Sequence, residues 1–200
     1  KDGLALRLYP SSAPSSTVAG WLAQGGVGYG SFEHGVFREN VVSARLLLPS
    51  GEVRTISGDE LDLVSEAEGI TGLILTVTLR LRRLSEPVVW GAQFQSAADL
   101  AAALQEVVAQ KLPLWSVSFT NPRMVALKNQ LPPKTEHGHP AAEPRPRLPE
   151  AHLVLFVAPA ERRAEVETGL RALIAAHKGS PLADELAQHE WQARFAIMHV

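Results

Sequence analysis

Alternating apolar and polar positions predict β-strands in the first half of the chain. The alternation runs through residues 42–48 and resumes at residues 53–56, and the segment between them, Pro49-Ser50-Gly51-Glu52, has the composition of a turn. We therefore expect a β-hairpin there. Residues 73–82 show the clearest alternation in the chain. There Leu73, Leu75, Val77, Leu79 and Leu81 alternate with Ile74, Thr76, Thr78, Arg80 and Arg82, which predicts a strand.

The sequence pattern changes at residues 82–87, where the long alternating segment ends, and we place a domain boundary there. Beyond it, residues 88–94 have the composition of a strand, and Ser96 begins a segment whose apolar side chains recur at helical spacing. This order of strand, helix, strand, strand and helix predicts a ferredoxin-like α+β layer. The further strands are expected at residues 114–119 and 152–157, and the further helices at residues 122–127 and 160–177.

Residues 130–150 interrupt this layer with six prolines and many charges, which predicts a loop or a disordered insert. The insert contains His137 and His139, a pair that a metal site can use. Imidazoles in such a segment are usually solvated, and we expect no metal site.

Composition narrows the class of protein. The 200 residues are 46% hydrophobic and 20% charged, which suits one large or two small domains with a core. The formal net charge of −2 and the lack of a basic patch argue against nucleic acid as a partner. No apolar run reaches the roughly 20 residues of a membrane span. The absence of cysteine excludes disulfides and thiolate chemistry, and is compatible with the cytoplasm, where we expect the protein.

Glycines are concentrated in residues 17–35, at a density too high for an ordinary helix or strand. Glycine serves where the backbone needs a positive φ or where a ligand approaches closely, and successive N–H groups can bind an anion. A phosphate-bearing cofactor is one interpretation, and a glycine-rich turn that binds nothing is the other. Neither a P-loop nor a Rossmann fingerprint is present, and Tyr29-Gly30-Ser31 lacks the Gly-x-Ser-x-Gly pattern of a hydrolase.

The order of several short motifs resembles the FAD-binding domain of the FAD-linked oxidase family, which includes vanillyl-alcohol oxidase and the glycolate oxidase D subunit. The pattern departs from the family at Ala19, which replaces the first glycine of a pair, and at Leu75, where isoleucine is usual. The motifs that carry the resemblance are Ser16-Thr17-Val18-Ala19-Gly20, Gly25-Gly26, Glu33-His34-Gly35, Ser50-Gly51-Glu52 and Glu68-Gly69-Ile70-Thr71-Gly72-Leu73-Ile74-Leu75-Thr76.

The resemblance implies an α+β fold in which residues 1–84 form the second half of a PCMH-type FAD-binding domain and residues 85–200 form part of a ferredoxin-like cap domain. It implies FAD as the cofactor. It also implies that Arg194 faces a substrate carboxylate, the alternative being an exposed helical arginine. The catalytic base is not identified. The residues expected to line FAD are Ser16, Thr17, Gly20, Gly25, Gly26 and Gly28, with Gly69, Gly72 and Ile74 approaching from the second strand.

The function implied is oxidation of a small molecule, a 2-hydroxy acid such as glycolate or lactate, by hydride transfer to FAD. The family's FAD domain has a long segment before the position that corresponds to Thr17, and we expect this chain to be a fragment or one piece of a split flavoprotein. Its partner would then be the missing half of the FAD domain, another subunit or a second copy. The alternative is a flavin-free scaffold that pairs with another subunit through its ferredoxin-like layer.

Overall fold

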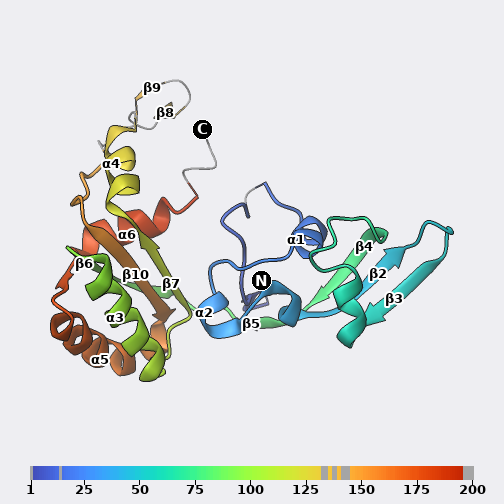
Figure 1. The fold of residues 1–200 in the computed structure, drawn as a ribbon, viewed down its shortest axis with the longest axis horizontal. Helices are drawn as coiled ribbons and strands as arrows, with labels where there is room; N and C mark the ends of the chain where they lie inside the picture. Colours follow the sequence, from blue (N-terminus) through green and yellow to red (C-terminus); the bar gives the residue numbers. More distant parts are fainter. Residues whose placement is uncertain (1, 14, 132–134, 137–138, 141–144, 196–200) are drawn as a thin grey trace. The chain divides into compact units, whose positions relative to one another are not determined.

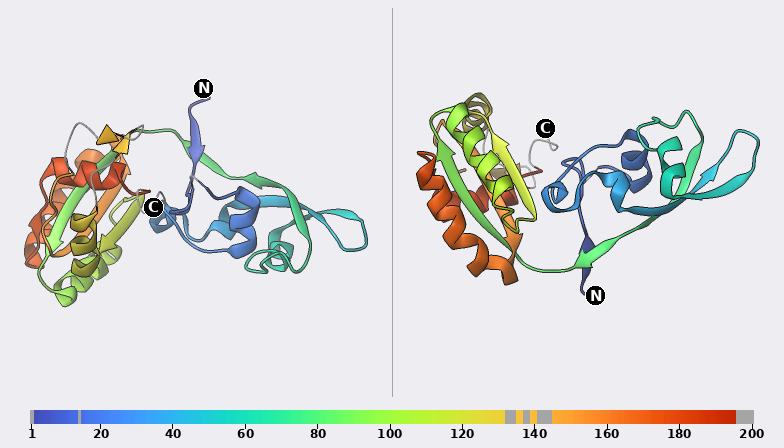
Figure 2. Two further views of the ribbon diagram at one scale, coloured as in Figure 1. Left: turned by 90° about the horizontal axis from the view of Figure 1, so that it is seen from above. Right: turned by 60° about the horizontal axis from the view of Figure 1, so that its bottom comes forward.

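The computed structural model of the chain describes residues 2–13, 15–131, 135–136, 139–140 and 145–195 (Figure 1). Contacts divide these residues into two compact units. The first unit consists of residues 2–86 with Arg194 and Phe195, and the second is Pro87–Ala193. The chain therefore leaves the first unit after Glu86 and returns to it after Ala193. Figure 2 shows the helices and strands of each unit from two further directions.

The first unit contains an antiparallel sheet of three strands in the order β3-β2-β4. Strands β2 (Val41–Leu47) and β3 (Val53–Ser57) form the predicted hairpin. The backbone N–H of Leu48 donates to the carbonyl of Glu52 at 2.9 Å, and Gly51 takes a φ of 87° in the turn. Strand β4 (Leu73–Leu79) pairs with the other edge of β2.

The alternating leucines of β4 do not form one buried face over the first half of the strand. Leu73 and Leu75 are 62% and 43% exposed, whereas Ile74 packs against the core. The cause is a register shift in the pairing with β2, where Thr76 lies opposite Arg45 but Ile74 lies opposite the next residue, Leu46. One extra residue in a strand reverses the alternation, because side chains alternate with a period of two.

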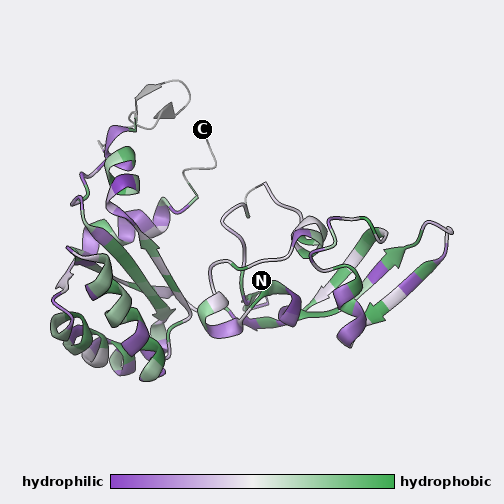
Figure 3. Cartoon of the chain, viewed as in Figure 1, coloured by the Kyte–Doolittle hydropathy of each residue, from purple (hydrophilic) through white to green (hydrophobic). Residues whose placement is uncertain are grey.

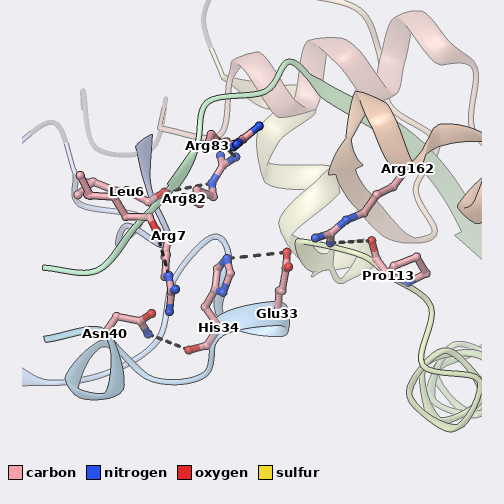
Figure 4. Close-up of polar contacts among 10 residues, drawn as sticks. Leu6, Arg7, Glu33, His34, Asn40, Arg82, Arg83, Pro113 and Arg162 are labelled. Carbon is pink, nitrogen blue, oxygen red and sulfur yellow. Dashed lines mark hydrogen bonds and ion pairs between the residues drawn. The ribbon is translucent and has the colours of Figure 1, made fainter. Parts of the chain in front are cut away.

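The predicted strand also divides near its end. Leu81 belongs to β5 (Leu81–Arg83), which pairs with β1 (Leu4–Leu6) in a two-stranded ribbon. The guanidinium of Arg82 donates to the carbonyl of Leu6 at 3.1 Å, and that of Arg7 donates to the carbonyl of Leu81 at 3.3 Å (Figure 4). Leu81 is 44% exposed, so it does not continue an inward face.

Helix α1 (Val18–Gln24) overturns the expectation that the glycine-rich stretch excludes a helix. The hydroxyl oxygen of Thr17 accepts from the backbone N–H of Gly20 at 3.0 Å and caps the first turn. The helix ends where the N–H of Gly25 donates to the carbonyl of Trp21 at 2.7 Å. Burial of Trp21 and Leu22 in the core offsets the cost of one interior glycine, and most of the glycines follow the helix rather than lie within it.

Three short helical segments complete the first unit: α2 (Ser31–His34), η1 (Phe37–Asn40) and η2 (Gly58–Leu63). The buried side-chain amide of Asn40 donates to the carbonyls of His34 at 2.8 Å and Val36 at 3.0 Å, which holds α2 against η1 (Figure 4). The core of the unit is formed by Leu8, Trp21, Leu22, Phe37, Val41, Ala44, Leu46, Ile56, Leu61 and Val64.

The second unit confirms the ferredoxin-like α+β layer. Its antiparallel sheet has the order β11-β6-β10-β7, with α3 (Ala97–Ala109) between β6 and β7 and α5 (Arg163–Ala176) between β10 and β11. A short 3₁₀ turn, η3 (Ala160–Arg162), leads into α5. The strands are β6 (Pro87–Phe94), β7 (Ser116–Thr120), β10 (His152–Pro159) and β11 (Ser180–Pro181).

Helices α3 and α5 cover one face of this sheet and bury an apolar core against it (Figure 3). The hydroxyl of Ser96 caps α3 by accepting from the N–H groups of Ala98 and Asp99, as its sequence predicts. The buried side chains of this core include Ala92, Phe94, Leu100, Val107, Val154, Phe156, Leu170 and Ile174.

Helices α4 (Pro122–Gln130) and α6 (Asp184–Gln192) belong to the same unit, and α6 was not predicted. Helix α6 lies on the face opposite to α3 and α5. A Cβ atom on Gly91, which alternates with the core residue Ala92, would meet Leu182 and Ala187. Lys128 on α4 forms an ion pair with Glu190 on α6.

The predicted structureless insert contains two short paired strands, β8 (Thr135–Glu136) and β9 (His139–Pro140). His137 lies outside the described residues, as does the side chain of His139, so their predicted solvation is not addressed by the structure. Asn129 holds the end of the insert: its amide donates to the carbonyl of Leu148 and its side-chain oxygen accepts from the N–H of Leu148, both at 2.9 Å.

We predict that Asn129→Ala lowers the free energy of unfolding of the second unit by about 2 kcal/mol, because it leaves two polar groups of the buried Leu148 without their partner. Urea unfolding followed by tryptophan fluorescence measures this change. The neighbouring exposed residue provides the control, since Gln130→Ala is expected to change the stability by less than about 0.5 kcal/mol. Equal effects of the two substitutions would show that the Leu148 contact does not stabilise the unit.

Candidate functional site

The two glycine-rich stretches lie together in the first unit. The backbone N–H of Glu66 donates to the carbonyl of Leu22 at 3.4 Å, and that of Glu68 donates to the carbonyl of Ala23 at 2.8 Å. The segment that precedes β4 therefore packs on the C-terminal end of α1, where Gly25 begins the glycine-rich loop. Distant parts of the sequence thus meet at one place, as the resemblance implies.

Positive φ angles are concentrated at this place. Gly25 and Gly26 have φ values of 77° and 112°, and Gly69 has a φ of 83°. Glu66 and Glu68 also take positive values, 60° and 50°, which L residues other than glycine adopt at a cost of roughly 1–2 kcal/mol each. Their hydrogen bonds to the end of α1 offset part of this cost, so the segment is held in a defined conformation.

Gly26 and Gly69 leave open space beside their backbone. A Cβ atom on Gly26 would have the indole nitrogen of Trp21 as its nearest neighbour, at 3.9 Å, and one on Gly69 would have no atom within 4 Å. Both positions thus allow a ligand to approach the main chain closely. Open backbone of this kind is compatible with a phosphate-bearing cofactor such as FAD, and the contact of these two glycines with FAD stays a prediction.

Other glycines of the predicted site are required by the fold itself. A Cβ atom on Gly28 would overlap the carbonyl of Tyr9, and one on Gly25 would overlap the side chain of Glu66. A Cβ atom on Gly72 would lie 2.7 Å from the carbonyl oxygen of Leu47, and one on Gly20 would lie 2.9 Å from the hydroxyl of Thr17. Their contact with FAD stays a prediction, because packing alone explains why these positions lack a side chain.

The remaining predicted residues differ in what their side chains can do. Ser16 and Thr17 are exposed, but the hydroxyl of Thr17 is engaged in capping α1. The side chain of Ile74 packs against the core of the first unit, so only its backbone is available to a cofactor.

Arg194 follows α6 and is half-buried in the first unit, so the alternative of an exposed helical arginine is wrong. Its guanidinium carbon lies 5.8 Å from the ring centroids of Tyr9 and Tyr29 and 4.6 Å from that of Phe195. One of its amino groups donates to the hydroxyl of Tyr9 at 3.2 Å. Its predicted role toward a substrate carboxylate is not tested by this geometry.

Sequence reasoning missed the aromatic cluster around Arg194. Tyr9 and Tyr29 are the two tyrosines of the chain, and each is followed or flanked by residues that favour turns. A tyrosine beside Pro10 and another between Gly28 and Gly30 were a usable signal, because a large ring in a turn needs a packing partner.

A cavity of about 370 Å³ lies in the second unit between β6 and α5. Its lining is mostly apolar and includes Trp90, Leu170, Ile174 and Leu182, with Arg171 and Asp184 as charged members. No residue of this cavity was predicted to be functional from the sequence.

Two classes of site are not seen in the part of the chain that the structure describes. No group of three or more histidine, aspartate or glutamate side chains is placed to hold a metal ion. Among the same residues, no helix combines the length and the apolar character needed to cross a membrane.

Comparison with known families and sequences finds one family match and similar proteins. The family model described as "FAD binding domain" matches residues 1–57. Alkyldihydroxyacetonephosphate synthase of Dictyostelium discoideum is 27% identical over 115 residues, which cover 54% of this chain and 19% of that protein. Mitochondrial D-lactate dehydrogenase [cytochrome] of Arabidopsis thaliana is 32% identical over 103 residues, which cover 45% of this chain and 18% of that protein. The chain thus spans about a fifth of these relatives.

Solved structures show the same fold over almost the whole chain. Two structures of alkyldihydroxyacetonephosphate synthase superimpose with TM-scores of 0.75 and 0.72 at 17% and 16% identity. They cover 98% and 97% of this chain, which corresponds to 38% and 40% of theirs. The family match and these relatives confirm the resemblance seen in the motifs. Residues 1–57 therefore match an FAD-binding domain, and the chain is similar to FAD-linked oxidases, whose cofactor is FAD.

Proposed function

We propose that the chain is part of an FAD-dependent oxidoreductase of the cytoplasm, with residues 1–84 as the C-terminal half of the FAD-binding domain and residues 85–200 as part of the cap domain. One observation carries this proposal. The open backbone faces of Gly26 and Gly69 occur in the same unit, on two segments that hydrogen bonds hold together, and residues 1–57 match an FAD-binding family.

The chain's own residues would hold and orient the cofactor. FAD, when bound, supplies the acceptor for a hydride, and the protein supplies position and electrostatics. Backbone N–H groups at Gly26 and Gly69 suit the negatively charged part of the cofactor, since bare amide groups of this kind bind anions. The capping hydroxyl of Thr17 fixes the helix that leads into the loop. The other residues we propose near FAD are Ser16, Gly20, Gly25, Gly28, Gly72 and Ile74.

We propose a 2-hydroxy acid such as glycolate or lactate as the substrate. The similarity to a protein named D-lactate dehydrogenase supports this class, and Arg194 is the proposed cation for the carboxylate. The similarity to a protein named alkyldihydroxyacetonephosphate synthase supports a second candidate, in which the flavin serves a synthase reaction. Reduction of the bound flavin by lactate or glycolate under anaerobic conditions distinguishes them, because only the first candidate predicts bleaching of the flavin spectrum.

We further propose that another segment, the remaining half of an FAD-binding domain, covers the first unit in the working protein. Large apolar side chains that are exposed in the described residues are far more frequent in the first unit than in the second, where they are limited to Val108, Phe119, Met124 and Leu127. Contiguous apolar patches on a protein surface mark interaction sites. Those of the first unit are Leu4, Leu6, Val18, Val27, Phe32, Val36, Val42, Val53, Leu63, Ile70, Leu73, Leu75, Leu81 and Leu84.

The proposal predicts that Gly26→Val abolishes FAD retention while the protein stays folded, because a side chain would fill the space beside the backbone of Gly26. The visible absorption spectrum of the purified protein after addition of FAD and gel filtration measures retention. Gly51→Val is the matched control, since Gly51 also has a positive φ, 87°, and open space around it, but lies in the β2–β3 turn.

Unchanged flavin content in Gly26→Val would contradict the assignment of Gly26. Equal loss in both variants would point to backbone strain rather than to cofactor contact. If the unmodified chain is colourless, adding the remaining half of the domain as a separate polypeptide tests whether the site needs completion. A protein that stays colourless in that mixture would favour the flavin-free scaffold.

A further inference from the structure

The aromatic cluster of Tyr9, Tyr29, Arg194 and Phe195 connects the end of the described chain to the glycine-rich loop. Its rings pack at centroid distances of 5.7 Å between Tyr9 and Tyr29 and 5.9 Å from each of them to Phe195. The guanidinium of Arg194 lies over all three rings. A cation in such a setting is attracted by the ring faces, and more strongly where water is excluded.

Hydrogen bonds fix the same residues in register. The backbone N–H of Tyr9 donates to the carbonyl of Tyr29 at 3.1 Å, and the N–H of Tyr29 donates to the carbonyl of Tyr9 at 2.9 Å. The hydroxyl of Tyr29 donates to the backbone carbonyl of Arg194 at 3.4 Å, and Arg194 donates to the hydroxyl of Tyr9 at 3.2 Å. Arg194 therefore contacts both partners of an isolated backbone bridge.

The bridge lies immediately after Gly25, Gly26 and Gly28 of the glycine-rich loop, which is the proposed cofactor loop. Gly26 is fixed on one side by the end of α1 at Gly25 and on the other by the bridge at Tyr29. The carbonyl of Gly26 also accepts from the N–H of Phe37 at 3.1 Å, and the ring of Phe37 stacks on Trp21 of α1. At the Tyr29 end, the N–H of Gly28 also donates to the hydroxyl of Ser31 at 2.9 Å, so loosening the bridge would remove one of the contacts that hold this end of the loop.

We propose that Arg194 is a positioning residue for the cofactor loop, acting through Tyr9 and Tyr29. This positioning role rests on the proposed function only for the identity of the ligand, FAD. The role differs from contact with a substrate carboxylate, because it concerns the protein before substrate binds. A guanidinium can also serve both roles, since it has five N–H donors.

The first test is residue-specific amide hydrogen exchange, by NMR and without FAD, in the unmodified chain and in Arg194→Gln. We expect exchange at the Tyr9 and Tyr29 amides to become about tenfold faster, because the variant loses the cation over the rings and the hydrogen bond to Tyr9. Exchange in β2 and in the second unit should be unchanged. A general loss of stability would accelerate exchange everywhere.

The second test is the dissociation constant of FAD, measured by quenching of flavin fluorescence. We expect Arg194→Gln to raise it about tenfold and Arg194→Lys to raise it less, since lysine keeps the charge but not the planar group. Arg171→Gln is the control, because Arg171 is an exposed arginine of α5 paired with Glu167. If Arg194→Gln does not fold, Tyr9→Phe removes only the hydroxyl and tests the same coupling.

Three outcomes would overturn the proposal. Unchanged exchange at Tyr9 and Tyr29 would show that Arg194 does not hold the bridge. Faster exchange with an unchanged dissociation constant would show that the bridge does not position the loop. An unmodified protein that binds no FAD, even with the rest of the domain added, would overturn the proposed function and the cofactor role together, and faster exchange would then identify the cluster as purely structural.

Discussion

Replacing Lys128 with methionine is expected to destabilise the second unit by about 3–5 kcal/mol. Lys128 on α4 is paired with Glu190 on α6, and Glu190 is only 8% exposed. Methionine matches the length of the lysine side chain but carries no charge, so the substitution leaves a buried carboxylate without its counter-ion. Removal of one partner of a buried pair costs far more than the pair itself contributes.

Urea unfolding in a Trp21→Phe background measures this effect, because the other three tryptophans, Trp90, Trp115 and Trp191, lie in the second unit. The double variant Lys128→Met with Glu190→Leu should recover most of the lost stability, since neither charge then remains buried. If the double variant is as unstable as Lys128→Met, the loss comes from packing rather than from the unpaired charge.

Gly28→Ala is expected to destabilise the first unit by about 3 kcal/mol. The new Cβ atom would overlap the carbonyl of Tyr9, which is a backbone atom and cannot move aside as a flexible side chain can. The same carbonyl accepts the N–H of Tyr29, so relief of the overlap breaks the Tyr9–Tyr29 bridge. The φ of Gly28 is not among the positive values, so steric overlap rather than backbone strain is the cause.

Gly51→Ala separates these two causes experimentally. Gly51 has a positive φ and no neighbouring atoms, so alanine there should cost about 1 kcal/mol through strain alone. Thermal unfolding of both variants, followed by the near-ultraviolet circular dichroism of Trp21 in a background without the other tryptophans, gives the comparison. A smaller loss in Gly28→Ala than in Gly51→Ala would contradict the close approach of Tyr9.

The second unit is the part of the fold that the sequence predicts best. The hydrophobic spacing in α3 and α5 and the apolar strands β6 and β10 follow from local pattern, and Ser96 marks the start of α3 as a capping residue should. Helix α6 escaped prediction because its buried residues are few: Ala187, Glu190 and Trp191. A glutamate at an inward position conceals the period until Lys128 is known to lie beside it.

The first unit shows where pattern reasoning fails. Helix α1 is short and contains a glycine, and its stability comes from burying Trp21 and Leu22 and from the Thr17 cap rather than from propensity. The bulge in β4 cannot be seen in the alternation, because it is set by pairing with β2. For the candidate site, the sequence predicts the glycines only as a group. It does not distinguish Gly26, where a Cβ atom would find open space, from Gly28, where the carbonyl of Tyr9 occupies that space.

The double crossing of the chain between its units also sets the order in which the protein can assemble during synthesis. Arg194 is made 185 residues after Tyr9 and 165 after Tyr29, a delay of roughly 10–40 s at typical ribosomal speeds. Nearly all of the second unit, Pro87–Ala193, is synthesised within that delay. The cluster around Arg194 therefore forms late, because Tyr9 and Tyr29 gain their contacts with Arg194 only after the second unit has been synthesised.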